Sequence, residues 1–352
     1  MKDINLYINE TPKGILTLRS KKLGKVRVVP MESMTQNYWR IIANCMQGNL
    51  SDVLVRSDGT ETGLTNGSSE DHRLNIGAEA GEEFGVVVGS GTNVVGLSDT
   101  GLQEVIRHGA ISGFLNYLET IAGIESGSEV TLIRLFENLS GAPIEVNEVG
   151  IFAVRGIDSD SEDAPYMLAR DLLDESFVIP DTDVMTVTTG LTVFTGTRNV
   201  KAILRGFVET GGYIDFYHRD GTVTSQSPFH INCLGGEASD LNGILLGRGD
   251  TPIEQDDIDL DDRIVNGGSA GQLVYGETTF NAPVISGNTI TWSFTRGIIN
   301  ASDEDIEVKE AGIFSYLNPK TSLLYRLVLP NPVLVEAGSN RNVNLNFRYQ
   351  IL

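Results

Sequence analysis

The chain has 352 residues, of which 47 are acidic and 26 are basic, so its formal net charge at pH 7 is −21. Negative charge of this size repels phosphate backbones, and the composition therefore argues against nucleic-acid binding as the main activity. Hydrophobic residues make up 40% of the chain, yet no apolar run approaches the roughly 20 residues of a membrane-spanning helix, and the first residues lack the pattern of a signal peptide. We therefore expect a globular protein that is made in the cytoplasm and binds no membrane.

The first 36 residues differ from the rest because most of their charged side chains are basic. Apolar residues alternate within residues 15–18 and 26–30, which is typical of extended strands. We predict an N-terminal arm or added strands over residues 1–36. Two interpretations remain open: the segment adds strands to a neighbouring molecule, or it completes the sheet of the first domain.

Residues 37–48 are ambiguous between a short helix and a strand. Their counterpart, residues 199–210, alternates like a strand, and counterparts should share one conformation, so we predict a strand at both places. Each segment is followed by a short apolar run and an Asp-Gly pair, at 58–59 and 220–221. Glycine supplies the positive φ of a tight turn, so both pairs predict β-hairpins.

A glycine-flanked apolar strand occurs twice in the chain. Residues 85–91 read Gly-Val-Val-Val-Gly-Ser-Gly, and residues 243–249, 158 positions later, read Gly-Ile-Leu-Leu-Gly-Arg-Gly. Residues 144–152 return in the same way at 306–314, 162 positions later. One fold is therefore expected in two copies.

The fold class that we predict is mostly β, with two tandem, homologous, antiparallel β-sandwich-like domains and a short helix in each. The first β domain is expected to cover residues 37–195 and the second residues 196–352. Aspartates that precede apolar residues place the short helices near residues 97–109 and 256–267.

The positions that repeat are those that build a scaffold. The Gly-x-Gly pairs lack the third glycine of a dinucleotide fingerprint and the lysine of a P-loop, so they favour a structural turn over a nucleotide site. Phe152 and Phe314 each end an alternating strand and are expected in the core. The structural repeat markers are Gly89, Gly91, Glu148, Gly150, Phe152, Gly247, Gly249, Glu310, Gly312 and Phe314.

Two of these markers, Glu148 and Glu310, lie in the middle of predicted strands, where a buried carboxylate needs a partner. We expect structural salt bridges rather than acid catalysis, because no second carboxylate of the kind found in a glycosidase pair repeats with them. The repeated arginines are the candidate partners: Arg134, Arg170, Arg296 and Arg326.

No catalytic site and no cofactor site is predicted. The four histidines are scattered, and no promising serine or cysteine neighbours them in the sequence. Cys45 and Cys233 are expected to be buried thiols rather than a disulfide. Two acidic runs, at residues 158–163 and 254–262, carry oxygen ligands of the kind that Ca²⁺ prefers, but neither has the spacing of an EF-hand loop, and solvated loops are favoured. The candidate Ca²⁺ ligands are Asp158, Asp160 and Glu162.

Several strings in the chain resemble one family of proteins. They are Gly-Ser-Gly-Thr at 89–92, Ile-Arg-Leu-Phe-Glu-Asn-Leu-Ser-Gly at 133–141, Ile-Glu-Val-Asn-Glu-Val-Gly-Ile-Phe at 144–152 and Leu-Ala-Arg-Asp at 168–171. Together these strings resemble virion structural proteins encoded by tailed bacteriophages. The resemblance covers residues 50–194 well and residues 214–349 more loosely, since Leu-Ala-Arg-Asp becomes Leu-Tyr-Arg-Leu at 324–327.

This resemblance implies a non-enzymatic structural component of the phage particle, in the tail, neck or fibre-attachment region. The implied partners are other virion proteins and further copies of the chain, without nucleic acid, and the implied location is the virion, assembled in the host bacterial cytoplasm. Two alternatives remain open: a head decoration protein, and a host-surface glycan-binding module or depolymerase. The low aromatic content, 7%, disfavours glycan binding, because sugar platforms use exposed aromatic faces.

Overall fold

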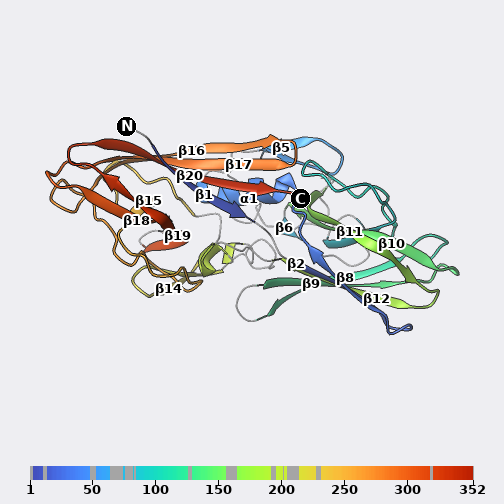
Figure 1. Cartoon of the computed structure of the whole chain (residues 1–352). Helices are drawn as coiled ribbons and strands as arrows, with labels where there is room; N and C mark the ends of the chain where they lie inside the picture. Colours follow the sequence, from blue (N-terminus) through green and yellow to red (C-terminus); the bar gives the residue numbers. More distant parts are fainter. Residues whose placement is uncertain are drawn as a thin grey trace.

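The computed structural model shows a mostly β protein, as predicted (Figure 1). It describes residues 3–10, 14–47, 53–63, 74–75, 82, 85–125, 129–155, 165–191, 196–200, 202–203, 214–226, 231–317 and 320–351. Within these ranges, no helix has both the length and the apolar character needed to cross a membrane.

Two sheets form the N-terminal half of the chain, up to residue 191. The first has five strands in the order β3-β2-β12-β9-β8, and in the second β10 pairs with β11, β7 and β6. The strands of the first sheet are β3 (Val26–Met31), β2 (Gly14–Ser20), β12 (Val184–Leu191), β9 (Glu129–Glu137) and β8 (Asn116–Glu125). Those of the second are β11 (Tyr166–Ile179), β10 (Ile144–Arg155), β7 (Gly85–Gly89) and β6 (Leu74–Asn75).

Two further sheets contain the strands of the C-terminal half, from residue 196 onward, together with one strand from the start of the chain. Their strand orders are β1-β20-β17-β16 and β15-β18-β19. The first consists of β1 (Ile4–Glu10), β20 (Asn340–Gln350), β17 (Thr289–Ile299) and β16 (Val274–Ser286). The second consists of β15 (Gly243–Gly247), β18 (Ile306–Leu317) and β19 (Lys320–Val335).

Both predicted Asp-Gly hairpins are present. Strand β4 (Val53–Val55) pairs with β5 (Glu61–Gly63), and β13 (Ile214–Tyr217) pairs with β14 (Val223–Gln226). Gly59 and Gly221 have φ values of 82° and 77°, as tight turns of this kind require.

The N-terminal strands divide between the two halves. Strands β2 and β3 extend the sheet of the N-terminal half, with β2 antiparallel to β12. Strand β1 instead joins the sheet of the C-terminal half, where it runs parallel to β20 with Ile4 opposite Val343. Residues 4–10 therefore occupy neither of the two places considered from the sequence, because they complete the sheet of the distant half of the same chain.

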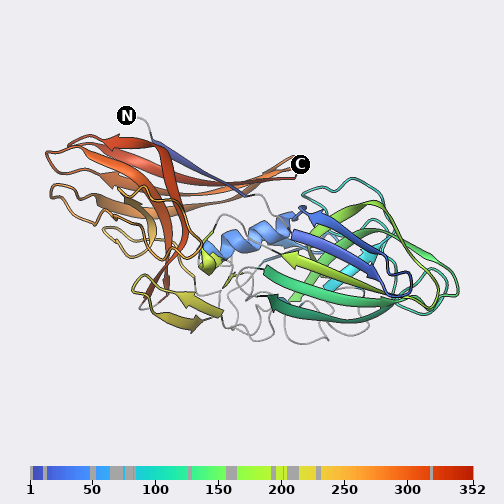
Figure 2. The same cartoon turned by 60° about the horizontal axis from the view of Figure 1, so that its bottom comes forward.

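The prediction of a strand over residues 37–48 was wrong. Residues 37–47 lie in helix α1 (Gln36–Gln47), and the described residues of the counterpart, 199–200 and 202–203, are helical too. Helix α1 contacts β11 of the N-terminal half as well as β16 and β17 of the C-terminal half, and in Figure 2 it lies between the two halves. Contact on both sides buries nearly every position of the helix. Its polar residues, at 37, 40, 44 and 47, nevertheless recur at helical spacing, so the helical period was present in the sequence and the alternation of residues 199–210 was wrongly given more weight.

The short helices predicted near residues 97–109 and 256–267 are also absent, since both segments form turns and irregular backbone. Their backbone N–H groups do not bond within a helix. Those of Gln103 and Glu104 donate to the carboxylate of Glu148, and those of Asp261 and Asp262 donate to Glu310. Among the described residues, helical structure lies elsewhere in each half, at α1 and at 198–200 and 202–203.

An aromatic cluster joins α1 to the C-terminal sheet. The ring centroid of Trp39 lies 4.6 Å from that of Tyr349 and 5.8 Å from that of Trp292, which stacks on Phe347 at 5.1 Å. Large aromatic rings contribute much of the apolar area buried in a core, so this cluster ties the two halves together.

Candidate functional site

The markers that repeat along the sequence come together around a buried carboxylate. Glu148 on β10 is fully buried. Its Oε1 accepts hydrogen bonds from the N–H groups of Gly91 (3.2 Å) and Glu104 (2.9 Å). Its Oε2 accepts from the N–H of Gln103 (3.2 Å) and from Nε of Arg170 (2.8 Å). Three backbone dipoles and one guanidinium thus offset the cost of burying the charge.

The same arrangement recurs in the C-terminal half. Glu310 on β18 is fully buried and accepts hydrogen bonds from the N–H groups of Gly249 (3.0 Å), Asp262 (3.0 Å) and Asp261 (3.3 Å). Nε of Arg326 donates to Oε2 of Glu310 at 2.9 Å. The expected structural salt bridges are therefore present, and in each half the partner is the arginine on the neighbouring strand, β11 or β19.

The repeated Gly-x-Gly turn wraps around this carboxylate. A Cβ atom at either Gly89 or Gly91 would lie 2.5 Å from Oε1 of Glu148, closer than any real contact of this kind. A Cβ at Gly249 would lie 2.6 Å from Oε1 of Glu310. The glycines are needed because the backbone of the turn packs directly against the buried glutamate. The N–H groups of Gly91 and Gly249, which a phosphate would use, already donate to this carboxylate.

Further carboxylates complete each cluster, one in the N-terminal half and two in the C-terminal half. Nη1 of Arg170 lies 2.6 Å from Oδ2 of Asp99, and the guanidinium of Arg326 lies 2.9 Å from Asp257 and 2.6 Å from Asp261. Burial lowers the pKa of a guanidinium, but these carboxylates outweigh burial and raise the pKa of both arginines above its usual value. We call these two groups the buried ion clusters.

The expectation of a solvated loop at residues 254–262 was therefore wrong in part. Asp257 and Asp261 belong to this run, and both bind the buried guanidinium of Arg326. Asp257 repeats Asp99 at the same offset of 158 residues as the Gly-x-Gly turns, so the repeat itself already set Asp257 apart from the rest of the run.

The other repeated arginines, Arg134 and Arg296, bind backbone carbonyl groups instead of carboxylates. Arg296 on β17 is fully buried and donates five hydrogen bonds to backbone carbonyls, among them those of Gly276 (2.8 Å) and Ile244 (3.0 Å). Arg134 donates to the equivalent carbonyls of Leu118 (2.7 Å) and Val86 (3.0 Å). Burial lowers the pKa of each arginine to about 10. Each guanidinium thereby links the two sheets of its half.

The structure brings one histidine to a serine, which sequence reasoning missed because the two residues are far apart in the chain. Nδ1 of His218 lies 2.8 Å from Oγ of Ser322, and its Nε2 lies 2.5 Å from Oγ1 of Thr224. His218 and Ser322 have no exposed surface, and burial lowers the pKa of the imidazole. Both ring nitrogens have partners, so the pair forms part of the core.

The remaining candidates from the sequence are the Ca²⁺ ligands and the two cysteines. Asp158, Asp160 and Glu162 lie outside the described residues. In the described part of the chain, no cluster of three or more His, Cys, Asp or Glu residues is arranged to hold a metal ion. Cys45 and Cys233 are buried free thiols, as expected, and burial raises the pKa of both.

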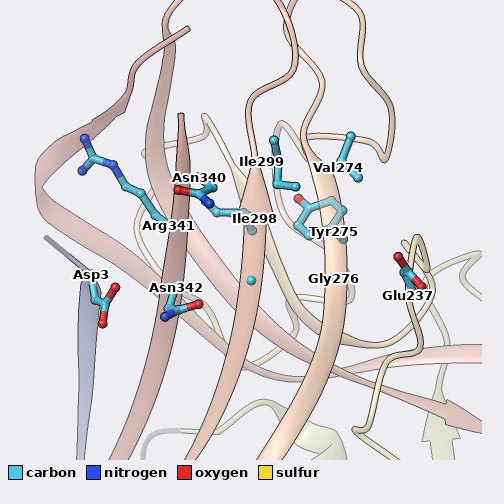
Figure 3. A pocket seen from close by; sticks show the side chains of 11 residues that line it. Asp3, Glu237, Val274, Tyr275, Gly276, Ile298, Ile299, Asn340, Arg341 and Asn342 are labelled. Carbon is cyan, nitrogen blue, oxygen red and sulfur yellow. The ribbon is translucent and has the colours of Figure 1, made fainter. Parts of the chain in front are cut away.

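A hollow of about 520 Å³ lies on the outer surface at one end of β16, β17 and β20 (Figure 3). Gly276 and Gly297 line the hollow. The corresponding positions of the N-terminal half hold the larger residues Leu118 and Leu135. Gly276 and Leu118 each accept a hydrogen bond from the buried arginine of their half. The polar side chains around it are Asp3, Glu237, Asn340, Arg341 and Asn342. In Figure 3, Asp3 and Asn342 project from neighbouring strands, and Glu237 lies on the opposite side.

The buried ion clusters can therefore hold sheets and loops in place, since each of their carboxylates and guanidinium groups is bonded within the protein. The hollow offers exposed amides and carboxylates, and the described residues that line it include no histidine, serine or cysteine. Comparison with known proteins adds no candidate, because no family model, no curated protein and no solved structure matches the chain.

Proposed function

We propose that this protein is a non-enzymatic structural component of a tailed-phage particle, built from two copies of one β module and located in the tail, neck or fibre-attachment region. The observation that carries the proposal is the pair of buried ion clusters. The charged residues that repeat between the halves bind one another and the backbone, so the repeated chemistry serves the scaffold.

The strand pairing supports the duplication on which this proposal depends. Gly89 pairs with Glu148 between β7 and β10, and Gly247 pairs with Glu310 between β15 and β18. Both β10 and β18 carry their first bulge next to the glutamate. Two similar modules in one chain suit quasi-equivalent positions in a symmetric assembly, which fits the resemblance to virion proteins.

Two measurements test the proposal. Mass spectrometry of gradient-purified particles is expected to detect the chain at a fixed ratio to the major structural proteins, and its absence from particles would contradict the location. The purified chain is expected to cleave neither bacterial polysaccharide nor peptidoglycan. Cleavage that persists in a fresh preparation would instead favour the depolymerase alternative.

A further inference from the structure

The outer surface of the five-stranded sheet is apolar. Along β3, β2, β12, β9 and β8, the side chains that point away from the core are mainly Ile, Val, Leu and Thr. Val28 is 61% exposed, Ile121 54% and Ile15 53%, and Ile133 and Leu135 on β9 are half-buried on the same side. We call this surface the N-terminal outer face. Exposed apolar side chains gathered on one face, with few charges among them, are typical of a surface that another molecule covers.

The matching face of the C-terminal half carries mainly polar side chains. There the outward positions of β1, β20 and β17 include Asn5, Asn344, Asn346, Ser293 and Thr295, which lie opposite one another in the ladder. Nδ2 of Asn344 donates to Oδ1 of Asn5 at 2.9 Å, and Oγ1 of Thr295 donates to Oδ1 of Asn344 at 2.9 Å. The fold therefore does not require an apolar outer face, and the N-terminal half has one for another reason.

Charge indicates what covers this face. Two copies of a chain with a net charge of −21 repel each other except where negative charge is sparse. Among the outward positions of the five strands whose side chains the structure describes, the charged residues are Arg19, Glu119 and Glu137. The N-terminal outer face is thus a place where a second copy can approach.

The register of the sheet makes the face self-complementary. Arg19 on β2 lies opposite Thr186 on β12, which lies opposite Leu135 on β9. Glu137 is two residues farther along β9, opposite Val184. Because β12 is the central strand, a two-fold axis along β12 sets β2 of each copy over β9 of the other. The cation of each copy then lies near the carboxylate of its partner.

We propose that the N-terminal outer face is the interface between two copies of this chain, which pack sheet on sheet about a two-fold axis along β12. This inference rests on the proposed structural function and names one of its partners. Aligned sheets pack at a spacing of about 10 Å with alternating side chains interdigitated, which suits a face of Ile, Val and Thr.

Sedimentation of the purified full chain tests the proposal. The wild-type chain is expected to sediment as a dimer, and Ile133→Asp to weaken dimerisation by about 100-fold, because it buries a charge without a partner. The matched control is Thr295→Asp, since Thr295 precedes Arg296 as Ile133 precedes Arg134. This control is expected to dimerise like the wild type. A monomeric wild type, or equal effects of the two variants, would overturn the proposal.

A charge exchange keeps the test decisive if Ile133→Asp fails to fold. Arg19→Glu and Glu137→Arg are each expected to weaken the dimer, and the double variant to restore it. Failure of the double variant to restore the dimer contradicts the two-fold arrangement. In addition, a short bis-maleimide is expected to cross-link two copies of Thr188→Cys, because residue 188 lies on β12, along the proposed axis. Thr295→Cys is expected to give no cross-linked dimer, since it lies on the other half. The native cysteines are buried and do not interfere.

These results are separable from those of the particle experiment. A wild-type dimer that is missing from particles contradicts the proposed function alone. A monomer that is present in particles contradicts this interface alone.

Discussion

Single residues in this protein show how a charge is kept inside a β-sheet core. Glu148 and Arg170 have almost no exposed surface, and a pair of this kind is stable only while both members are present. A buried ion pair is poor evidence for added stability, since an apolar pair of the same volume often does as well. Its removal on one side is costly, however, because the other charge stays buried.

We expect Arg170→Ala to lower the free energy of unfolding by about 3 to 5 kcal/mol, because it leaves Glu148 and Asp99 without their cation. The measurement is urea unfolding at neutral pH. The control is Arg27→Ala, whose partners Asp174 and Glu175 are 71% and 79% exposed and whose loss should cost about 1 kcal/mol or less. Equal costs for the two variants would contradict the account of the buried ion clusters.

Asp171 predicts a pH dependence. Burial raises its pKa from 3.8 to about 6, although hydrogen bonds from Ser33 and Glu32 act in the opposite direction. Between pH 4 and 6 the folded state therefore holds a proton that the unfolded state has lost, so this group favours folding at low pH and the benefit is lost as pH rises through 6. Leu327 occupies the matching place opposite Ala311, which shows that the framework accepts an uncharged residue there.

We expect Asp171→Asn to be more stable than the wild type at pH 7, by about 2 to 3 kcal/mol, with the advantage vanishing toward pH 4. Urea unfolding at pH 4, 5, 6 and 7 measures the difference. The exposed Asp174→Asn is the control and should show no such trend. A constant difference across this range would rule out the titration of Asp171 as the cause.

At the scale of elements, the Gly-x-Gly turn after β7 has a defined steric reason. Gly89→Ala places a methyl group against Oε1 of Glu148 and should destabilise the protein by about 1 to 3 kcal/mol. Gly101 lies in the same connection with open space around it, so Gly101→Ala is the matched control and should have little effect. Thermal unfolding of the two variants compares them, and a neutral Gly89→Ala would show that the turn relaxes freely.

Strand β1 predicts a link between the start of the chain and its last strand. Ile4 and Ile8 are buried to within 4% and 2% exposure against the C-terminal sheet. Deleting residues 1–10 should therefore destabilise the C-terminal half and open the edge of β20. Hydrogen exchange is expected to speed up in residues 340–350 while β12 stays protected. Unchanged exchange in β20 would mean that β1 adds nothing to this sheet.

The elements also show what the sequence can and cannot reveal. Strands such as β2 and β17 were predictable because their side chains alternate between core and surface. The hairpins at Gly59 and Gly221 were predictable because their turns need glycine. Helix α1 was missed although its polar residues recur at helical spacing, because the alternation of its counterpart, residues 199–210, was given more weight.

The candidate site was predictable to a similar extent. Repetition singled out Glu148 and the arginines, but the choice of Arg170 over Arg134 depends on which sheet each arginine belongs to. Arg170 lies on β11, next to β10, whereas Arg134 lies on β9 of the other sheet. Asp99 and Asp257 also repeat in the sequence, but they lie in irregular connections, so their contacts with Arg170 and Arg326 are seen only in the structure. The backbone N–H groups that bind the glutamates carry no sequence signal.

At the scale of the whole molecule, the two halves extend in opposite directions from α1 (Figure 2). Helix α1 contacts both halves, and strand β1, from the start of the chain, pairs with β20 of the C-terminal half, so the two halves are joined by more than the covalent chain. The outer faces differ, with mainly amides and hydroxyls on the C-terminal sheet and mainly Ile, Val, Leu and Thr on the N-terminal sheet. A shared framework with different faces suits a protein that meets different neighbours in one assembly.

The central claim is our proposal that this chain is a non-enzymatic structural component of a tailed-phage particle. Electron microscopy of purified particles labelled with a gold-conjugated antibody against the chain tests it most directly. We predict label at one fixed place on the tail, neck or fibre-attachment region of most particles. Particles without label, alongside unassembled chain detected by the same antibody in the infected cell, would contradict the account.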